Sequence, residues 1–200
     1  MKLKKLTSTR RGRVALAAVP AAVAVTVLMG GVASGAVPVS FAVSGQAFQV
    51  GASELDGTGF SQYSGVALDA KKNQIPVAIS NIQDATLHDL CQYVAVAGPI
   101  GLRIDAGNDP KKPATATGLQ IGMSDLKGDA TFHDINIGID ASTVRTDSKG
   151  SQGDFAQDAK DVTITNLQQT AYSTTAGTFN LKGLHMAIST DKSKGQCFPG

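Results

Sequence analysis

Apolar residues spaced two apart recur along most of this chain, and this spacing constrains its secondary structure more than any other feature. It occurs in Val39-Phe41-Val43, Ile75-Val77-Ile79, Leu119-Ile121-Met123, Ile135-Ile137-Ile139, Val162-Ile164 and Leu184-Met186-Ile188. Successive side chains of a strand point to opposite faces, so the spacing predicts strands with one apolar face. Composition agrees, because 15 of the 16 acidic residues are Asp and 22 residues are Gly, types that weaken helix interiors. The sequence therefore predicts an all-β fold.

A short pattern recurs at a period of about 40 residues, the length of one supersecondary unit in repeat proteins. Residues 77–83, 121–127 and 162–168 share an apolar-x-apolar-[Ser/Thr]-[Asn/Asp]-[Leu/Ile]-polar pattern, and residues 85–90 match residues 130–135. The pattern predicts a single domain of repeated β-hairpin units, arranged as a curved meander, a sandwich or a β-solenoid. Polar, Gly- or Pro-rich breaks predict loops at 57–59, 70–73, 106–113 and 146–153.

The first 36 residues have the features of a secretory leader. Six basic residues and no acid precede Val14, an apolar stretch runs to Ala33, and Ser34 and Ala36 supply small residues before Val37. This order is typical of a signal peptide, so the sequence predicts residues 1–36 as signal peptide and 37–200 as the secreted β domain. An uncleaved membrane anchor is the alternative, although Pro20 and the many Ala and Gly residues weaken it.

Removal of the leader would reverse the net charge. The whole chain has 18 Lys and Arg against 16 Asp and Glu, and the leader holds six of the bases and none of the acids, which leaves 12 against 16. No basic stripe with interleaved aromatic residues remains, so a nucleic-acid partner is not expected.

Cys91 and Cys197 are the only cysteines. In an oxidising compartment an even pair predicts a disulfide, which would close a loop of about 105 residues. A metal site or a nucleophilic thiol is the alternative. The sequence does not favour it, because it contains no CxxC motif and no histidine adjacent to either cysteine.

Local motifs of catalysis and of cofactor binding are absent from the sequence. It contains no Gly-x-Ser-x-Gly elbow, phosphate-binding glycine loop, HExxH or EF-hand loop. His88 and His133 stand at equivalent positions of the repeat, each before an Asp, and are interpreted as polar surface positions rather than as metal ligands. Asp105, Asp109, Asp154, Asp158 and Asp161 carry the oxygen ligands that Ca²⁺ prefers, but loop acids more often serve solubility. No metal or cofactor is predicted, and the catalytic residues stay unknown.

Several segments resemble a family of uncharacterised actinobacterial secreted proteins whose members often carry the label "cholesterol esterase". They are residues 40–46, 55–60 with Gln62-Tyr63, 89–92 and 195–198. The resemblance implies export, a fixed pair of cysteines matching Cys91 and Cys197, and an envelope partner, because members are often encoded beside a small multi-pass membrane protein. It implies no catalytic residue in this chain.

These observations favour an exported cell-envelope protein, without catalytic activity, that binds an apolar, lipid-like ligand or a membrane-protein partner. The apolar strand faces in a chain without a recognisable active site are the reason. A lipid or sterol ester hydrolase, which rests on the inherited label, and a structural surface protein are the alternatives. The sequence does not indicate the oligomeric state.

Overall fold

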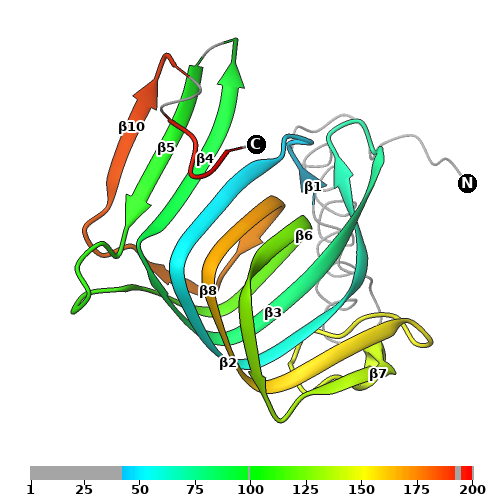
Figure 1. Ribbon diagram of the computed structural model, residues 1–200. Coiled ribbons are helices and arrows are strands. Elements are labelled where there is room, and N and C mark those ends of the chain that lie inside the picture. The colour runs from blue at the N-terminus through cyan, green and yellow to red at the C-terminus, as the bar shows by residue number, and fades with distance from the viewer. Residues whose placement is uncertain (1–41, 99, 192–194, 200) are drawn as a thin grey trace, which may run out of the picture. The chain divides into compact units, whose positions relative to one another are not determined.

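Strands dominate the fold, and the predicted all-β class is confirmed. A computed structural model describes residues 42–98, 100–191 and 195–199 (Figure 1). The predicted leader, Val39 and Phe41 lie outside these residues. The elements are β1 (Ala42–Val43), β2 (Phe48–Asp69), β3 (Gln74–His88), β4 (Leu90–Ala97), β5 (Ile100–Ala106), β6 (Ala114–His133), β7 (Asn136–Asp140), the 3-10 helix η1 (Ala141–Thr143), β8 (Phe155–Thr175), β9 (Thr178–Asn180) and β10 (His185–Ser189).

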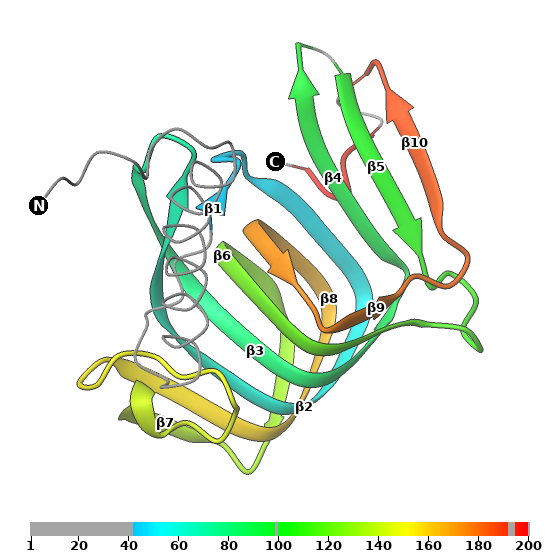
Figure 2. The ribbon, with the colours of Figure 1, turned by 180° about the vertical axis from the view of Figure 1, so that it is seen from behind.

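The four longest strands form a closed ring, called here the strand ring. β2 pairs with β3, β3 with β6, β6 with β8, and β8 pairs back onto β2, all antiparallel. Both views show these strands curling strongly (Figures 1 and 2). Because the strands are 15 to 22 residues long, each carries a long row of side chains to one face, and closure brings these rows together.

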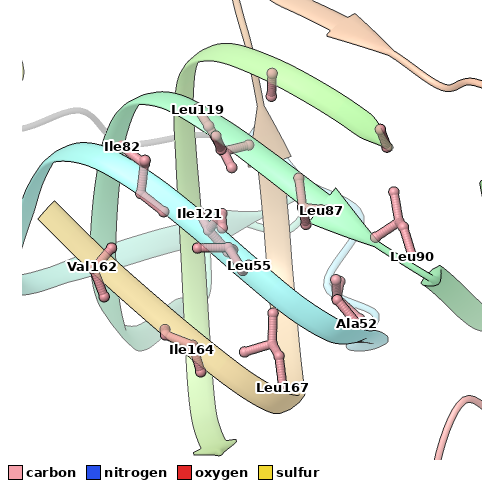
Figure 3. Close-up of a cluster of buried hydrophobic side chains, with 14 of the residues drawn as sticks. Ala52, Leu55, Ile82, Leu87, Leu90, Leu119, Ile121, Val162, Ile164 and Leu167 are labelled. Carbon is pink, nitrogen blue, oxygen red and sulfur yellow. The ribbon is translucent and has the colours of Figure 1, made fainter. Parts of the chain in front are cut away.

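The main core fills the inside of the strand ring. Leu55, Ile82, Leu119, Val162 and Leu167 come from its four strands and are at most 3% exposed. Figure 3 shows side chains of this cluster pointing toward one another. Such burial accounts for the alternation seen in the sequence, since the apolar face of each strand meets the others across the ring.

The loop predicted at residues 57–59 is wrong, because these residues lie in the middle of β2. A Cβ on Gly57 would lie 2.6 Å from Cγ2 of Ile82 and 3.2 Å from Cγ1 of Val162, so glycine permits close packing inside the ring. Gly59 has a φ of +63° and stands where the pairing of β2 with β8 passes over one residue. The glycines therefore serve packing and a local irregularity rather than a turn.

The recurring sequence pattern is not reproduced as a structural unit in the described residues. Its three copies lie in different environments: Ser80, Asn81 and Ile82 are buried, Ser124, Asp125 and Leu126 are exposed, and in the third copy only Leu167 of the matching three is buried. The second block keeps one common feature, because Asp89 and Asp134 both have positive φ, of 51° and 55°, and both follow the end of a long strand.

A second core lies beneath the segment between β7 and β8. Val144 and Ala141 of that segment are fully buried in a cluster with Tyr63, Val77 and Ile79 of the ring strands. A buried polar chain also links the two parts: Asn81 donates to Ser61 Oγ at 3.1 Å, and Ser61 Oγ contacts Thr146 Oγ1. Burial raises the pKa of Tyr63, and the nearby amides of Asn81 and Gln120 only partly oppose that rise.

Arg145 fastens the same segment to β8 through a buried carboxylate. Asp158 is 1% exposed and accepts hydrogen bonds from Arg145 Nε at 3.0 Å, from the Arg145 backbone N–H at 2.9 Å and from Asn136 Nδ2 at 3.0 Å. Arg145 also donates to Asp134 Oδ2 at 2.8 Å. The ion pair therefore holds three parts of the chain together.

In the part of the chain that the structure describes, no helix is long and apolar enough to span a bilayer.

Candidate functional site

Three strands extend the sheet away from the strand ring, and they are called here the arm. β4 joins β2 through only three residue pairs, at residues 49–51, and β5 and β10 follow it in the sheet order (Figures 1 and 2). Beyond Tyr93, β4 has no partner except β5. Beyond Tyr93 the arm therefore has two faces that, in the described part of the chain, neither the ring nor a second sheet covers.

One face of the arm is covered by the chain end at residues 195–199. A disulfide joins Cys91 to Cys197, with the two Cα atoms 5.8 Å apart. Gln49 of β2 accepts a hydrogen bond from the backbone N–H of Cys197 at 3.0 Å and donates to the carbonyl of Phe198 at 3.0 Å. Arg103 donates to the carbonyl of Gln196 at 3.0 Å. This face is therefore closed by covalent and polar contacts within the chain.

Tyr93 and the Arg103–Asp105 pair lie on the same covered face. The Tyr93 ring fills the space beside Gly101 and Gly195, where any added Cβ would lie within 2.6 Å of a ring atom. Arg103 makes a two-pronged ion pair with Asp105, its Nη2 lying 2.8 Å from Oδ1. Hydrogen bonding to Asp105 raises the pKa of Arg103 further above its usual value. These contacts fix the chain end on the sheet.

The opposite face, called here the arm face, is apolar and open. Met186 lies opposite Ile104, and Ile188 opposite Leu102, across the pairing of β10 with β5; Leu102 in turn lies opposite Val94 of β4. Cross-strand partners share a face, so these side chains form one continuous surface. Met186 is 58% exposed, Ile188 74% and the preceding Leu184 51%. In the described part of β4, β5 and β10, no charged side chain lies on this surface.

The arm face continues the core-facing surface of the ring. Gln92 lies opposite Val50, which belongs to the main core, and Leu90 of β4 is 1% exposed in that same core. The same row of side chains is thus buried inside the ring and uncovered along the arm. At the tip of the arm, Val96 and Ile100 are 54% and 40% exposed.

A groove of about 220 Å³ lies where the arm meets the ring, and it is called here the arm groove. Val94, Leu102 and Ile104 form its arm side. Phe48, Gln46 and Ser44 precede or begin β2 and form its other side, and Gln92, Tyr93 and Tyr172 complete the lining. The side-chain amides of Gln46 and Gln92 make no hydrogen bond to the described residues. An apolar groove with a few polar groups is the usual composition of a ligand site.

A larger groove, of about 400 Å³, lies elsewhere, between the end of β2 and the segment at residues 149–154. It includes Tyr63, Val66, Lys149 and Asp154. Lys149 is already bonded to the Val144 carbonyl, and Val66 is the exposed large apolar side chain in the lining. Its lining also contains Leu68 and Ile79, but it shares no residue with the arm.

The three histidines lie apart. His88 ends β3, His133 ends β6, and His185 begins β10 with its Nδ1 3.9 Å from Asp105 Oδ2. Asp89 accepts a hydrogen bond from Ser53 Oγ at 2.7 Å. Among the described residues, no hydrogen bond joins a histidine ring to a hydroxyl or thiol, so the structure brings together no Ser–His or Cys–His pair there.

The aspartates considered for Ca²⁺ are also dispersed. Asp105 pairs with Arg103 and Asp158 with Arg145, whereas Asp109 stabilises its own turn by accepting from the backbone N–H of Lys111 at 2.9 Å. In the chain outside the gaps at 1–41, 99, 192–194 and 200, no three His, Cys, Asp or Glu side chains form a group suited to a metal ion.

The sequence pattern predicts a strand with one apolar face at Leu184-Met186-Ile188. The strand β10 contains Met186 and Ile188, whereas Leu184 directly precedes it. The pattern did not predict that this face would be uncovered. The sequence signal for this site is the run Val94–Leu102, which contains no charged or hydrogen-bonding side chain. The same composition is also typical of a buried core strand, so the sequence alone did not identify the site.

Comparison with known protein families assigns the chain to a family but gives no activity. The model of a family of unknown function matches residues 44–198. Neither a curated protein nor a solved structure matches the chain.

Proposed function

The chain belongs to this family of unknown function, DUF6230, and we propose that it is an exported protein of the cell envelope that binds an apolar, lipid-like partner through the arm face. The observation that carries the proposal is the open, charge-free surface formed by Leu102, Ile104, Leu184, Met186 and Ile188. Soluble proteins rarely leave large contiguous apolar patches uncovered unless the patches bind something.

Hydrocarbon suits this surface better than another protein does. A protein interface usually contains a hydrogen bond for every 100–200 Å², and the arm face offers side-chain partners for such bonds only at the Gln92 end. Lipid chains need none, and covering the face removes apolar area from water at no cost in unsatisfied polar groups. The free edge of β10 offers backbone groups to a protein strand, which makes a protein partner the competing outcome.

Export is supported by two features. Residues 1–36 have the order of charges, apolar residues and small residues of a signal peptide. Cys91 and Cys197 form a disulfide, a bond that persists in oxidising compartments and is rare in the cytosol.

The first prediction concerns processing. Cleavage of the leader is expected to produce a secreted protein that begins at Val37 or within a few residues of it, because Ser34 and Ala36 supply the small residues that a signal peptidase accepts. N-terminal sequencing of the protein from the culture medium tests this. Recovery of the chain in the membrane fraction with Met1 retained would contradict it.

The second prediction concerns the arm face. The variant Met186→Asp/Ile188→Asp places two charges on it and is expected to reduce both co-purifying lipid and flotation with phosphatidylcholine vesicles at least tenfold, because charged groups do not enter hydrocarbon readily. Both side chains are exposed, so the fold is expected to persist. Lipid is measured by mass spectrometry of an organic extract.

The matched control is Ile137→Asp/Phe155→Asp. These side chains are 65% and 63% exposed but lie on β7 and β8, away from the arm, so lipid binding is expected to be unchanged. Wild-type protein that carries no lipid and does not float with vesicles would overturn the proposed function.

A further inference from the structure

The arm groove has a small volume. Its volume of about 220 Å³ lies below the roughly 300–1,000 Å³ typical of sites that enclose a whole small molecule. A fused sterol ring system is a rigid plate that cannot divide itself between the groove and the surface beyond it. A flexible chain, in contrast, can place its first carbons in the groove and leave the rest outside.

The surface beyond the groove provides a path for the rest of such a chain. From Gln92 to Val96 the strand β4 advances four residues, about 13 Å at roughly 3.3 Å for each residue. One leaflet of a bilayer, half of a hydrocarbon core about 30 Å thick, is about 15 Å. The arm therefore offers an apolar path nearly as long as one leaflet is thick, bordered by Val94, Leu102 and Ile100.

Among the described residues that line the groove and β4, the polar side chains lie at one end of this path. Gln92 is at the base of the arm, where β4 meets β2, and Ser44 and Gln46 face it across the groove. The side-chain amides of Gln46 and Gln92, which make no hydrogen bond within the described part of the chain, can both donate and accept hydrogen bonds. Toward the tip, the side chains of Val94, Val96 and Ile100 are apolar. This distribution matches a molecule with a polar head and an unbranched tail.

We propose, on the basis of the proposed function, that the arm groove binds a single acyl chain of a lipid. The head lies beside Gln46 and Gln92, and the tail runs along β4 and β5 toward Val96 and Ile100. Sterols are expected to bind weakly, because a rigid fused ring system cannot be enclosed in a groove of this volume.

The test is a competition experiment on the secreted protein. A fluorescent C16 fatty acid is the probe, and palmitate, octanoate and cholesterol are the competitors. Palmitate is expected to displace the probe. Octanoate is expected to compete at least tenfold more weakly, because each buried methylene contributes about 0.8 kcal/mol and eight are missing. Cholesterol is expected not to compete at concentrations at which palmitate displaces half of the probe.

Two variants locate the site. Leu102→Arg places a charge in the groove, and Gln46→Trp fills it from the ring side at an exposed position where the fold tolerates a larger residue. Each is expected to weaken probe binding at least tenfold, and the control Ile137→Arg is expected to bind as the wild type does. Circular dichroism checks that each variant is folded, and if Leu102→Arg is not, Gln46→Trp alone decides.

The outcomes separate this inference from the proposed function. If cholesterol competes as well as palmitate, or if Gln46→Trp binds the probe like the wild type, the acyl-chain site is wrong while lipid binding by the arm face stands. If neither fatty acid nor sterol binds and vesicles are not bound either, both proposals fail.

Discussion

Replacing Cys91 with serine is expected to lower the free energy of unfolding by about 3–5 kcal/mol, typical of the loss of a native disulfide that closes a long loop. The bond joins residues 106 positions apart. Without it the unfolded chain gains conformational freedom, and the native chain end at residues 195–199 loses its covalent link while it keeps the hydrogen bonds to Gln49 and from Arg103. Urea unfolding, followed by circular dichroism without reductant, measures the change.

The two single variants test whether one bond is the cause. Cys197→Ser is expected to have the same effect as Cys91→Ser, and the double variant is expected to be no less stable than either, because all three lack the same bond. An unchanged urea midpoint for either single variant, or two titratable thiols in the air-purified wild type, would contradict the prediction.

The class of fold was predictable because the apolar spacing is local information. Ile75, Val77 and Ile79 lie two apart whatever the rest of the chain does, and so they specify a strand. Closure of the four strands is not local, because it depends on which distant strand each edge meets. Gly57 shows the difference: in sequence a glycine beside Thr58 and Gly59 predicts a turn, and only the approach of Ile82 and Val162 explains it as a packing residue.

The candidate site was less predictable, for a related reason. Leu119 and Ile188 have the same kind of alternating neighbours, yet Leu119 is 2% exposed and Ile188 is 74% exposed. The difference is the position of the strand, because β6 lies in the ring whereas β10 lies at an edge of the sheet. A pattern shows that a face is apolar. Whether the protein itself covers that face is decided by tertiary structure.

The buried ion pair could not be inferred from sequence either, since Arg145 and Asp158 are 13 residues apart, with Arg145 in the irregular segment before β8 and Asp158 within β8. Asp158 stood out in the sequence only as one of several loop acids, whereas the structure places it within β8. Its side chain is 2% exposed, and that of Arg145 is 41% exposed. Without its partner, the Asp158 carboxylate would be a buried, unpaired charge, whereas the Arg145 guanidinium would still be partly solvated.

Replacing Arg145 with glutamine is expected to destabilise the protein by about 3–5 kcal/mol at pH 7, because the Asp158 carboxylate is then buried without a compensating charge. The exposed pair of Lys127 with Asp125, 3.6 Å apart, is the control, and Lys127→Gln is expected to change stability by about 0.5 kcal/mol or less. Urea unfolding at fixed pH measures both.

The destabilisation by Arg145→Gln is expected to depend on pH. In the wild type, burial alone would raise the pKa of Asp158, but hydrogen bonds from Arg145 and Asn136 outweigh burial and lower it. A lowered pKa adds stability above the unfolded value of about 3.9, and this stability is lost as the pH falls through the folded value. Without the Arg145 guanidinium, its hydrogen bond and charge no longer oppose burial, so the pKa of Asp158 is expected to be higher in the variant than in the wild type, and the variant loses less stability as the pH falls. The stability difference between wild type and variant is therefore expected to narrow from pH 7 to about pH 3.

A second substitution separates the buried charge from the lost contacts of the arginine. Adding Asp158→Asn to Arg145→Gln removes the uncompensated charge while nearly keeping the side-chain volume, so the double variant is expected to be more stable than Arg145→Gln alone at pH 7. If it is no more stable, the contacts of Arg145 with Asp134, rather than charge burial at Asp158, hold the segment between β7 and β8 on the ring.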